Sequence, residues 1–337
     1  MIAPELAQSF HGKRVLITGG LGFIGSTLAR ELVAAGSDVI LIDSLIPEYG
    51  GNVFNIAGIE DDLRVNISDV RDAYSLRYLV QGRDVLFNLA GQTSHLDSMH
   101  NPNTDLEINC RSQLSILETC RHVNPEIRVV FASTRQIYGR PQYLPVDERH
   151  PLNPVDVNGI NKTAGEWYHL LYGEVYGIPV TVLRLTNTYG PRMRVQDARQ
   201  TFLGYWLRLA VDEEELQIWG DGLQKRDFNY VDDVVRALLL SASSDQAVGK
   251  VYNLGDDEVV SLKELAELLV TANGGAGGYR IVPFPEDRKA IDIGDYYGDH
   301  SLARQDLGWD PRVPLAEGLE RSLAFYRAHR DRYWGGS

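Results

Sequence analysis

Apolar runs and segments of helical period alternate through the first half of this chain. Runs rich in β-branched residues, which are typical of buried strands, lie at 15–18, 38–43, 63–67, 84–90, 127–133 and 180–185. Apolar residues at helical spacing predict helices between them, at 26–35, 73–80, 106–121 and 160–176. Alternation of this kind is typical of an α/β protein with a doubly wound parallel sheet.

The pattern loosens after residue 186, where glycine-rich loops separate the predicted elements. A further strand is predicted at 251–254, and helices at 232–241, 261–272 and 315–329. We therefore predict a first domain over 1–186, to which segments at about 231–254 return. A smaller, discontinuous α/β domain would consist mainly of 187–337.

The stretch VLITGGLGFIG, residues 15–25, has the order of a strand, a glycine turn and a helix start. Gly19 would allow the tight turn, Gly22 would let the backbone approach a phosphate, and Gly25 would let helix and strand pack closely. The free N–H groups at the helix start favour negative charge. The stretch therefore predicts a dinucleotide-binding site.

The second strand ends in Asp43, about twenty residues after the glycines, where such a fold places an acid for a ribose 2′-hydroxyl. A carboxylate at that point repels a 2′-phosphate. We therefore expect NAD rather than NADP as the cofactor.

Composition and charge exclude several classes of function. The net charge of −13 over 337 residues argues against nucleic acid or an anionic membrane as a partner. Cys110 and Cys120 fit neither a disulfide framework nor a zinc site, so we expect no metal. No secretory leader and no apolar run of about eighteen residues is visible, so we expect a cytoplasmic protein.

Together these stretches resemble the extended short-chain dehydrogenase/reductase family, and in particular its nucleotide-sugar epimerases and dehydratases. The resemblance rests on TGGLGFIG at 18–25, NLAGQ at 88–92, FASTRQIYG at 131–139, RLTNTYGP at 184–191 and WGDGLQKRDFNYVDDVV at 219–235. It implies a Rossmann domain that binds NAD, followed by a domain that binds a nucleotide sugar.

The resemblance also implies a role for individual residues. The NAD site would consist of Gly19, Gly22, Phe23, Ile24, Gly25, Asp43, Asp69, Val70, Leu89, Ala90, Gln92 and Lys162. Thr134 would bond the reacting hydroxyl, and Asn187 would reach the diphosphate of the substrate. Arg226 and Arg288 would neutralise its phosphates, because the guanidinium fork matches phosphate oxygens.

The chain departs from the family at its acid–base residue. These enzymes carry Tyr-x-x-x-Lys, which places the two side chains one helical turn apart. The lysine is Lys162, but the position of the tyrosine holds Asn158, whose amide is no general acid or base. The acid pair of the family's dehydratases is also missing, since Arg135 and Gln136 stand there.

His95 is the candidate to replace the tyrosine, because it follows the strand that faces the nicotinamide and because histidine ordinarily titrates near neutral pH. A structural or sugar-binding histidine is the alternative. Lys162, Thr134, Asn158 and His95 thus form the candidate catalytic set. Glu166, one turn after Lys162, is expected to be its ion-pair partner.

The function that these residues favour is epimerisation: a sugar carbon is oxidised to a transient ketone and then receives the hydride back. The alternatives are a catalytically silent protein that binds NAD and a nucleotide sugar, a dehydratase with unusual acid–base groups, and an oxidoreductase that acts stoichiometrically on another substrate. The nucleotide, the sugar and the reacting carbon stay open.

The family resemblance also implies a homodimer. It would pair the helices near 106–121 and 160–176 of two copies into a four-helix bundle. Apolar surface for this contact is offered by Leu114, Leu117, Trp167 and Leu171, for which core packing within one copy is the alternative.

Overall fold

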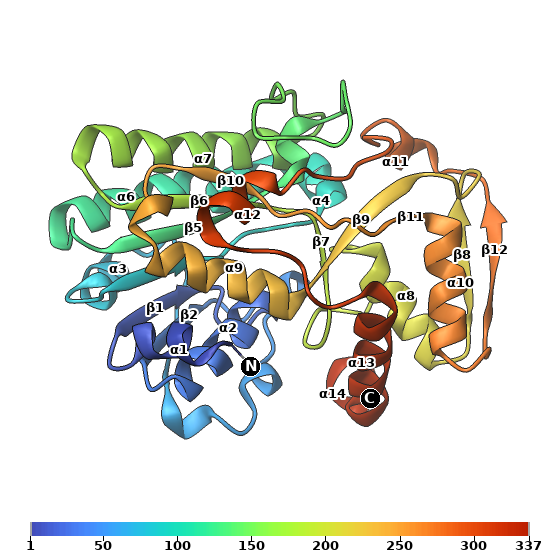
Figure 1. The fold of residues 1–337 in the computed structure, drawn as a ribbon, viewed down its shortest axis with the longest axis horizontal. Coiled ribbons are helices and arrows are strands. Elements are labelled where there is room, and N and C mark those ends of the chain that lie inside the picture. Colours follow the sequence, from blue (N-terminus) through green and yellow to red (C-terminus); the bar gives the residue numbers. More distant parts are fainter. Residues whose placement is uncertain (1, 336–337) are drawn as a thin grey trace.

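The computed structural model describes residues 2–335 and is built around a parallel sheet of seven strands (Figure 1). Its strands, from one edge to the other, are β10 (Val251–Asn253), β6 (Val180–Leu185), β5 (Arg128–Thr134), β4 (Val85–Asn88), β1 (Arg14–Thr18), β2 (Asp38–Asp43) and β3 (Arg64–Ile67). The chain order reverses between β1 and β4, and ligands of such sheets bind outside the carboxyl ends of the strands at that point.

Successive residues of each central strand face opposite sides of the sheet, as the pleat requires. Val15 and Ile17 pack on one side, while Leu16 packs on the other. Helices cover both faces, so the inner strands β1, β2 and β4 are mainly apolar along their length, whereas the edge strand β3 is mostly exposed. One face carries α1 (Pro4–Phe10), α2 (Phe23–Ala34) and α9 (Val231–Ser243), and the other carries α3 (Ala73–Val80), α6 (Ser112–Val123) and α7 (Val157–Tyr176).

The second region lies beyond the carboxyl ends of the strands, on the right in Figure 1. Its two small sheets are β11 (Val259–Ser261), β9 (Lys225–Tyr230) and β7 (Asn187–Tyr189), and β12 (Gly278–Val282) with β8 (Glu215–Trp219). Its helices are α8 (Phe202–Val211), α10 (Leu262–Ala272), α11 (Glu286–Lys289), α13 (Leu315–Ala328) and α14 (Arg330–Tyr333). The helix α12 (Ser301–Leu307) packs against both β10 and α9.

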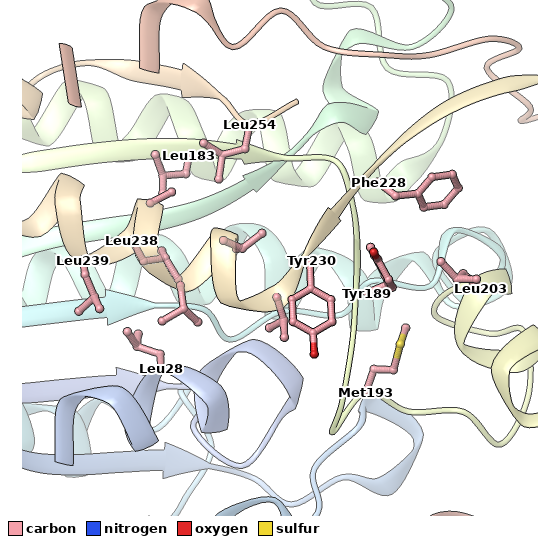
Figure 2. Packing of buried hydrophobic residues seen from close by; sticks show 14 of the residues in the cluster. Leu28, Leu183, Tyr189, Met193, Leu203, Phe228, Tyr230, Leu238, Leu239 and Leu254 are labelled. Carbon is pink, nitrogen blue, oxygen red and sulfur yellow. The ribbon is translucent and has the colours of Figure 1, made fainter. Parts of the chain in front are cut away.

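One hydrophobic core joins the two regions. Figure 2 shows it passing from Leu28 and Leu238, beneath the large sheet, through Tyr189 to Phe228 and Leu203 of the second region. Because the core is continuous, the relative placement of the two regions is set by close packing. The space left between them is where a site can form.

The structure corrects several predicted elements. The segment predicted as one helix at 106–121 consists of α5 (Pro102–Leu106), a π-helical turn (Glu107–Arg111) and α6. No helix was predicted between the strand at 84–90 and the helix at 106–121, but α4 (His95–His100) lies there, and the Ser94 hydroxyl at its start accepts a hydrogen bond from Asp97 N. The helix α8 and the strands β8, β9 and β12 had no clear signal in the sequence.

Three side chains of the predicted dimer surface are partly exposed: Trp167 is 59% exposed, Leu171 is 48% exposed and Leu114 is half-buried. Leu117 is fully buried against the large sheet, so its place on that surface was wrong. Within residues 2–335, no helix has both the length and the apolar character needed to cross a membrane.

Candidate active site

A cavity of about 630 Å³ opens between the large sheet and the second region. All but one of the residues predicted for the site line it, and several stand at the carboxyl ends of different strands. They are Gly19, Gly22, Phe23, Ile24, Gly25, Asp43, Asp69, Val70, Leu89, Ala90, His95, Thr134, Asn158, Lys162, Asn187, Arg226 and Arg288. The fold therefore gathers one site from segments far apart in the chain.

The glycine turn between β1 and α2 forms one end of this cavity. Gly19 has a φ of +69°, a conformation that side chains rarely adopt. A Cβ on Gly25 would lie 2.2 Å from the Gly19 carbonyl oxygen, so only glycine allows the helix to pack against the turn. No side chain caps the first turn of α2 at Gly22, which leaves its N–H groups to face a phosphate.

Asp43, at the end of β2, supports the same turn. Its carboxylate accepts hydrogen bonds from the backbone N–H groups of Leu21 at 2.9 Å and Leu45 at 2.8 Å. Burial raises the pKa of Asp43, while these N–H donors oppose the rise. Asp69 lies farther along the cavity, and its hydrogen bond with Arg71 lowers the pKa of Asp69.

Buried polar contacts hold the turn after β4 in place. Thr18 Oγ1 donates to Asn88 Oδ1 at 2.8 Å and accepts from the N–H groups of Leu89 and Ala90, both at 3.1 Å. Asn88 Nδ2 is in turn 3.1 Å from His169 Nε2. Burial lowers the pKa of His169 to about 4, so this histidine is neutral and structural.

Lys162 projects from the second turn of α7, and its Nζ donates to the Ala132 carbonyl at 3.0 Å. Burial lowers the pKa of Lys162 to about 8, against the charges of Asp105 and Glu166. The predicted ion pair with Glu166 was wrong. Glu166 instead pairs with Arg184 of β6 at 2.5 Å, in a buried position fixed by the sheet.

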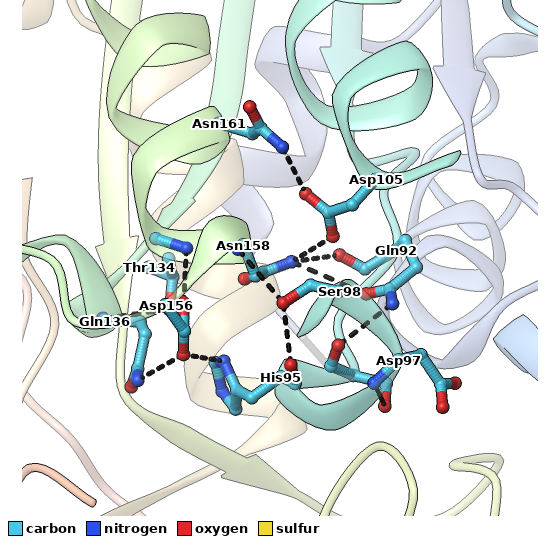
Figure 3. Close-up of polar contacts among 12 residues, drawn as sticks. Gln92, His95, Asp97, Ser98, Asp105, Thr134, Gln136, Asp156, Asn158 and Asn161 are labelled. Atoms are coloured by element: carbon cyan, nitrogen blue, oxygen red, sulfur yellow. Dashed lines mark hydrogen bonds and ion pairs between the residues drawn. The ribbon is translucent and has the colours of Figure 1, made fainter. Parts of the chain in front are cut away.

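Asn158 occupies the first turn of α7, and its amide points into a buried polar cluster (Figure 3). Asn158 Nδ2 donates to the Gln92 carbonyl at 2.8 Å and to Asp105 Oδ2 at 3.0 Å. Asn109 and Asn161 also donate to the Asp105 carboxylate, at 3.0 and 2.8 Å. The asparagine therefore serves as a donor within the protein interior.

Gln92 is the predicted site residue that does not line the main cavity. It is 1% exposed, and its Nε2 donates to the Ser94 carbonyl at 2.9 Å. Its backbone carbonyl accepts from Asn158, as described above. Gln92 therefore contacts Asn158, which lines the main cavity, but does not line that cavity itself.

His95, at the start of α4, faces a buried carboxylate beside Thr134 (Figure 3). His95 Nδ1 lies 2.9 Å from Asp156 Oδ2, at an angle outside hydrogen-bond geometry. Asp156 also caps α7 through Gly159 N at 2.7 Å and accepts from Gln136 Nε2 at 2.8 Å. Burial raises the pKa of Asp156, but His95 and these donors hold it below its ordinary value.

The other end of the cavity is basic. Arg135 Nη2 donates to Asn187 Oδ1 at 3.0 Å. Arg226 is 6% exposed, and burial together with the charge of Arg135 lowers the pKa of Arg226 to about 10. The Arg288 guanidinium lies 4.4 Å from the centre of the Trp219 ring. This end is suited to an anionic ligand.

Comparison with known proteins agrees with this geometry. The model of the NAD-dependent epimerase/dehydratase family matches residues 15–255. The chain belongs to that family. A UDP-glucose 4-epimerase of Mycolicibacterium smegmatis is 31% identical over 315 residues, which cover 93% of this chain and 98% of that protein.

Two further proteins are similar to this chain over most of its length. UDP-glucuronic acid decarboxylase 1 of Xenopus tropicalis is 31% identical over 323 residues, 94% of this chain and 72% of that protein. The crystal structure of a UDP-glucose 4-epimerase from Thermotoga maritima with UDP-glucose has a TM-score of 0.85 and 30% identity. That comparison covers 94% of this chain and 99% of the other.

NAD is the cofactor of this family member, and the residues present fit it. The uncapped start of α2 faces the cavity beside Gly19 and Gly22, where a pyrophosphate is accepted in such folds. Asp43 lines the same end and brings the negative charge that disfavours a 2′-phosphate. The donor set is therefore that of a dinucleotide site.

Sequence reasoning missed the two buried carboxylates of the site. Asp156 carries a local signal, because an aspartate three residues before Gly159 and ahead of a helical pattern is typical of an N-cap. Asp105 carries none, since its asparagine partners come from two other elements. Residues of the second region that line the cavity were also missed, namely Arg194, Arg199, Phe202, Trp219 and Phe284.

Proposed function

We propose that this enzyme inverts one carbon of the sugar of a nucleotide sugar. NAD, when bound, accepts a hydride from that carbon and returns it to the opposite face. The single observation that carries the proposal is that His95, paired with Asp156, lies in the wall of the cavity that also contains Lys162 and Thr134. A titratable group thus stands where the family's tyrosine is missing.

In this scheme we assign a role to His95, Asp156 and Thr134. His95 Nδ1 faces Asp156, so Nε2 is the atom that takes the proton of the sugar hydroxyl and later returns it. The buried Asp156 carboxylate stabilises the imidazolium that forms, as the aspartate of a catalytic triad does. Thr134 Oγ1 already accepts from Gln136 N, which leaves its hydrogen for the substrate hydroxyl.

Binding of the two ligands is assigned to the ends of the cavity. Lys162 would hold the nicotinamide ribose, with Leu89 and Ala90 beside it, and Asp43 would hold the adenosine ribose. Asn187, Arg226 and Arg288 would bind the diphosphate of the substrate. The relatives named above act on UDP sugars, so UDP is the first nucleotide to test.

The alternatives are less well supported. A dehydratase of this family would need acids where Arg135 and Gln136 stand, and Gln136 is occupied with Asp156. A catalytically silent protein would have little use for a histidine beside a buried carboxylate.

The experiment that tests the proposal is incubation of the purified protein with UDP, CDP, GDP and dTDP sugars, with products identified by chromatography and mass spectrometry. An isomer of unchanged mass supports epimerisation. Loss of the mass of water indicates a dehydratase, and no conversion by protein that retains NAD indicates a binding protein.

The role of His95 is tested with His95→Asn. Loss of a positioned base lowers turnover by about 10²–10⁴-fold, while NAD binding persists. His100→Asn is the matched control, because His100 is exposed on the same helix α4 and does not line the main cavity. Equal turnover of the two variants would contradict the assignment.

We also propose that the protein is a cytoplasmic homodimer whose residues 1–186 bind NAD and whose residues 187–337 mainly bind the substrate. Trp167 and Leu171, exposed on α7, support a contact between two copies through this helix. Sedimentation as a monomer at micromolar concentration would contradict the dimer.

A further inference from the structure

One positive charge in the cavity, that of Arg135, has no ion-pair partner among the side chains that the structure describes, although the carboxylates of Asp227, Asp292 and Asp156 act on it electrostatically. Arg135 follows Thr134 directly, at the end of β5, and both residues line the cavity. Arg135 Nη2 donates to Asn187, and its guanidinium carbon lies 5.3 Å from the centre of the Tyr296 ring. Nη1 is buried and has no hydrogen-bond partner.

The acidic residues around Arg135 are engaged elsewhere. Among the side chains that the structure describes, no carboxylate lies within 4.0 Å of the Arg135 guanidinium, the limit for an ion pair. Asp227 accepts from Thr186 Oγ1 at 2.6 Å and from Gly298 N at 2.9 Å. Asp292 accepts from Gln224 Nε2 at 2.6 Å. A buried charge without a partner is unfavourable, so this site is suited to an anion from outside.

The place of Arg135 indicates which part of the substrate it meets. In the proposed function, Thr134 bonds the reacting hydroxyl, while Arg226 and Arg288 meet the diphosphate. Arg135 is the neighbour of Thr134 in the chain and is joined to Asn187 by its Nη2, so it lies between these two contacts. In the proposed function, it would therefore meet the sugar.

We propose that the sugar carries a carboxylate and that Arg135 binds it, so that the substrate is a nucleotide-activated acidic sugar such as a uronic acid. This inference rests on the proposed function. The planar guanidinium matches a carboxylate, and Nη1 supplies a donor that the protein leaves unused. A neutral sugar would leave the same buried charge without a partner.

The test compares UDP-glucuronate with UDP-glucose, and UDP-galacturonate with UDP-galactose, by kcat/KM for conversion. We expect the wild type to prefer the acidic sugars by at least about 100-fold, since a buried polar group left unpaired discriminates strongly. In Arg135→Leu, kcat/KM for the acidic sugars should fall about 100-fold, and that for the neutral sugars should rise.

Two further variants make the outcome specific. Arg135→Lys keeps the charge but loses the fork, so its preference for acidic sugars should be intermediate. Arg149→Leu removes the same charge from an exposed position outside the cavity and should behave as the wild type. The Lys variant and the wild-type preference also remain informative if the Leu variant does not fold.

Three other outcomes would overturn the inference, and each points to a different cause. Equal use of neutral and acidic sugars by the wild type would overturn it while leaving the epimerase function intact. An equal fall for both sugar types in Arg135→Leu would place Arg135 on the diphosphate. Failure of the wild type to convert any nucleotide sugar would overturn the proposed function, and this inference with it.

Discussion

The two ends of the cavity are built in different ways. At the cofactor end, the cavity is formed by a turn with a positive φ at Gly19 and by the uncapped start of α2, which offer backbone N–H groups to a ligand. At the part of the cavity proposed for acid–base chemistry, which holds His95, Asp156 and Asn158 and is called the acid–base end below, side chains from separate elements converge, as His95 of α4 and Asp156 at the start of α7 do.

This difference determines which substitutions each end can tolerate. A backbone site depends on local conformation and on the absence of side chains at a few glycines. A side-chain site depends on partners that satisfy one another, because a buried polar group without a partner costs about 1–3 kcal/mol. In this chain the glycine turn depends on Gly19 and Gly25, while the acid–base end contains Asn158, whose amide is satisfied by partners inside the protein.

Of the three changes that compare the two ends of the cavity, Gly25→Ala at the cofactor end should have the largest effect. The new Cβ would lie 2.2 Å from the Gly19 carbonyl oxygen, so the turn must shift. Overpacking of this kind costs up to about 3 kcal/mol, which corresponds to roughly 100-fold weaker NAD binding. Titration calorimetry with NAD measures it.

Gly278→Ala is the control for that variant, because nothing lies within 4 Å of a Cβ built there. It should bind NAD as the wild type does. If Gly25→Ala also bound NAD with unchanged affinity, the turn would not be the cofactor site.

The next effect is at the other end, for Asn158→Tyr, which restores the family's residue. The Asn158 amide donates to Gln92 O and Asp105 Oδ2 inside the protein. A tyrosine cannot supply both bonds, so we expect the free energy of unfolding to fall by about 1–3 kcal/mol and turnover to fall at least about tenfold.

Chemical denaturation and product formation measure these two quantities. Asn103→Tyr makes the same exchange at an exposed position of α5 and should change neither. A rise in turnover of Asn158→Tyr would mean that the site is an impaired copy of the family's, with no replacement for the tyrosine.

The cofactor end could be predicted from the sequence because its signals are local, and the structure places the predicted residues along the cavity. The order of strand, glycine turn and helix is read within residues 15–25, and Asp43 follows at a fixed distance. The acid–base end could be predicted only in part. His95 was found from its place after a strand, but Asp105 meets Asn158 from 53 residues away, which no spacing reveals.

Local spacing also misled where tertiary contacts compete. Glu166 stands four residues after Lys162, the usual spacing of a helical ion pair. In the fold, Glu166 faces Arg184 of β6 and Ser133 of β5, whose hydroxyl donates to it at 2.6 Å. The packing of α7 on the sheet decides this pairing, so the partner of a buried charge needs the fold.

The smallest effect tests how the two ends meet, at Lys162, whose pKa is lowered to about 8 by burial. Its ammonium is present below that pH and is lost above it. If the ammonium holds the nicotinamide ribose, NAD binding should weaken about fivefold as pH rises through 8, because a charged donor is worth about 1 kcal/mol more than a neutral one. Calorimetry from about pH 6 to about pH 9.5, a range that spans this pKa, measures the change. Lys162→Met should bind more weakly at every pH and show no step near pH 8, whereas a step of equal size in this variant would assign the titration to another group.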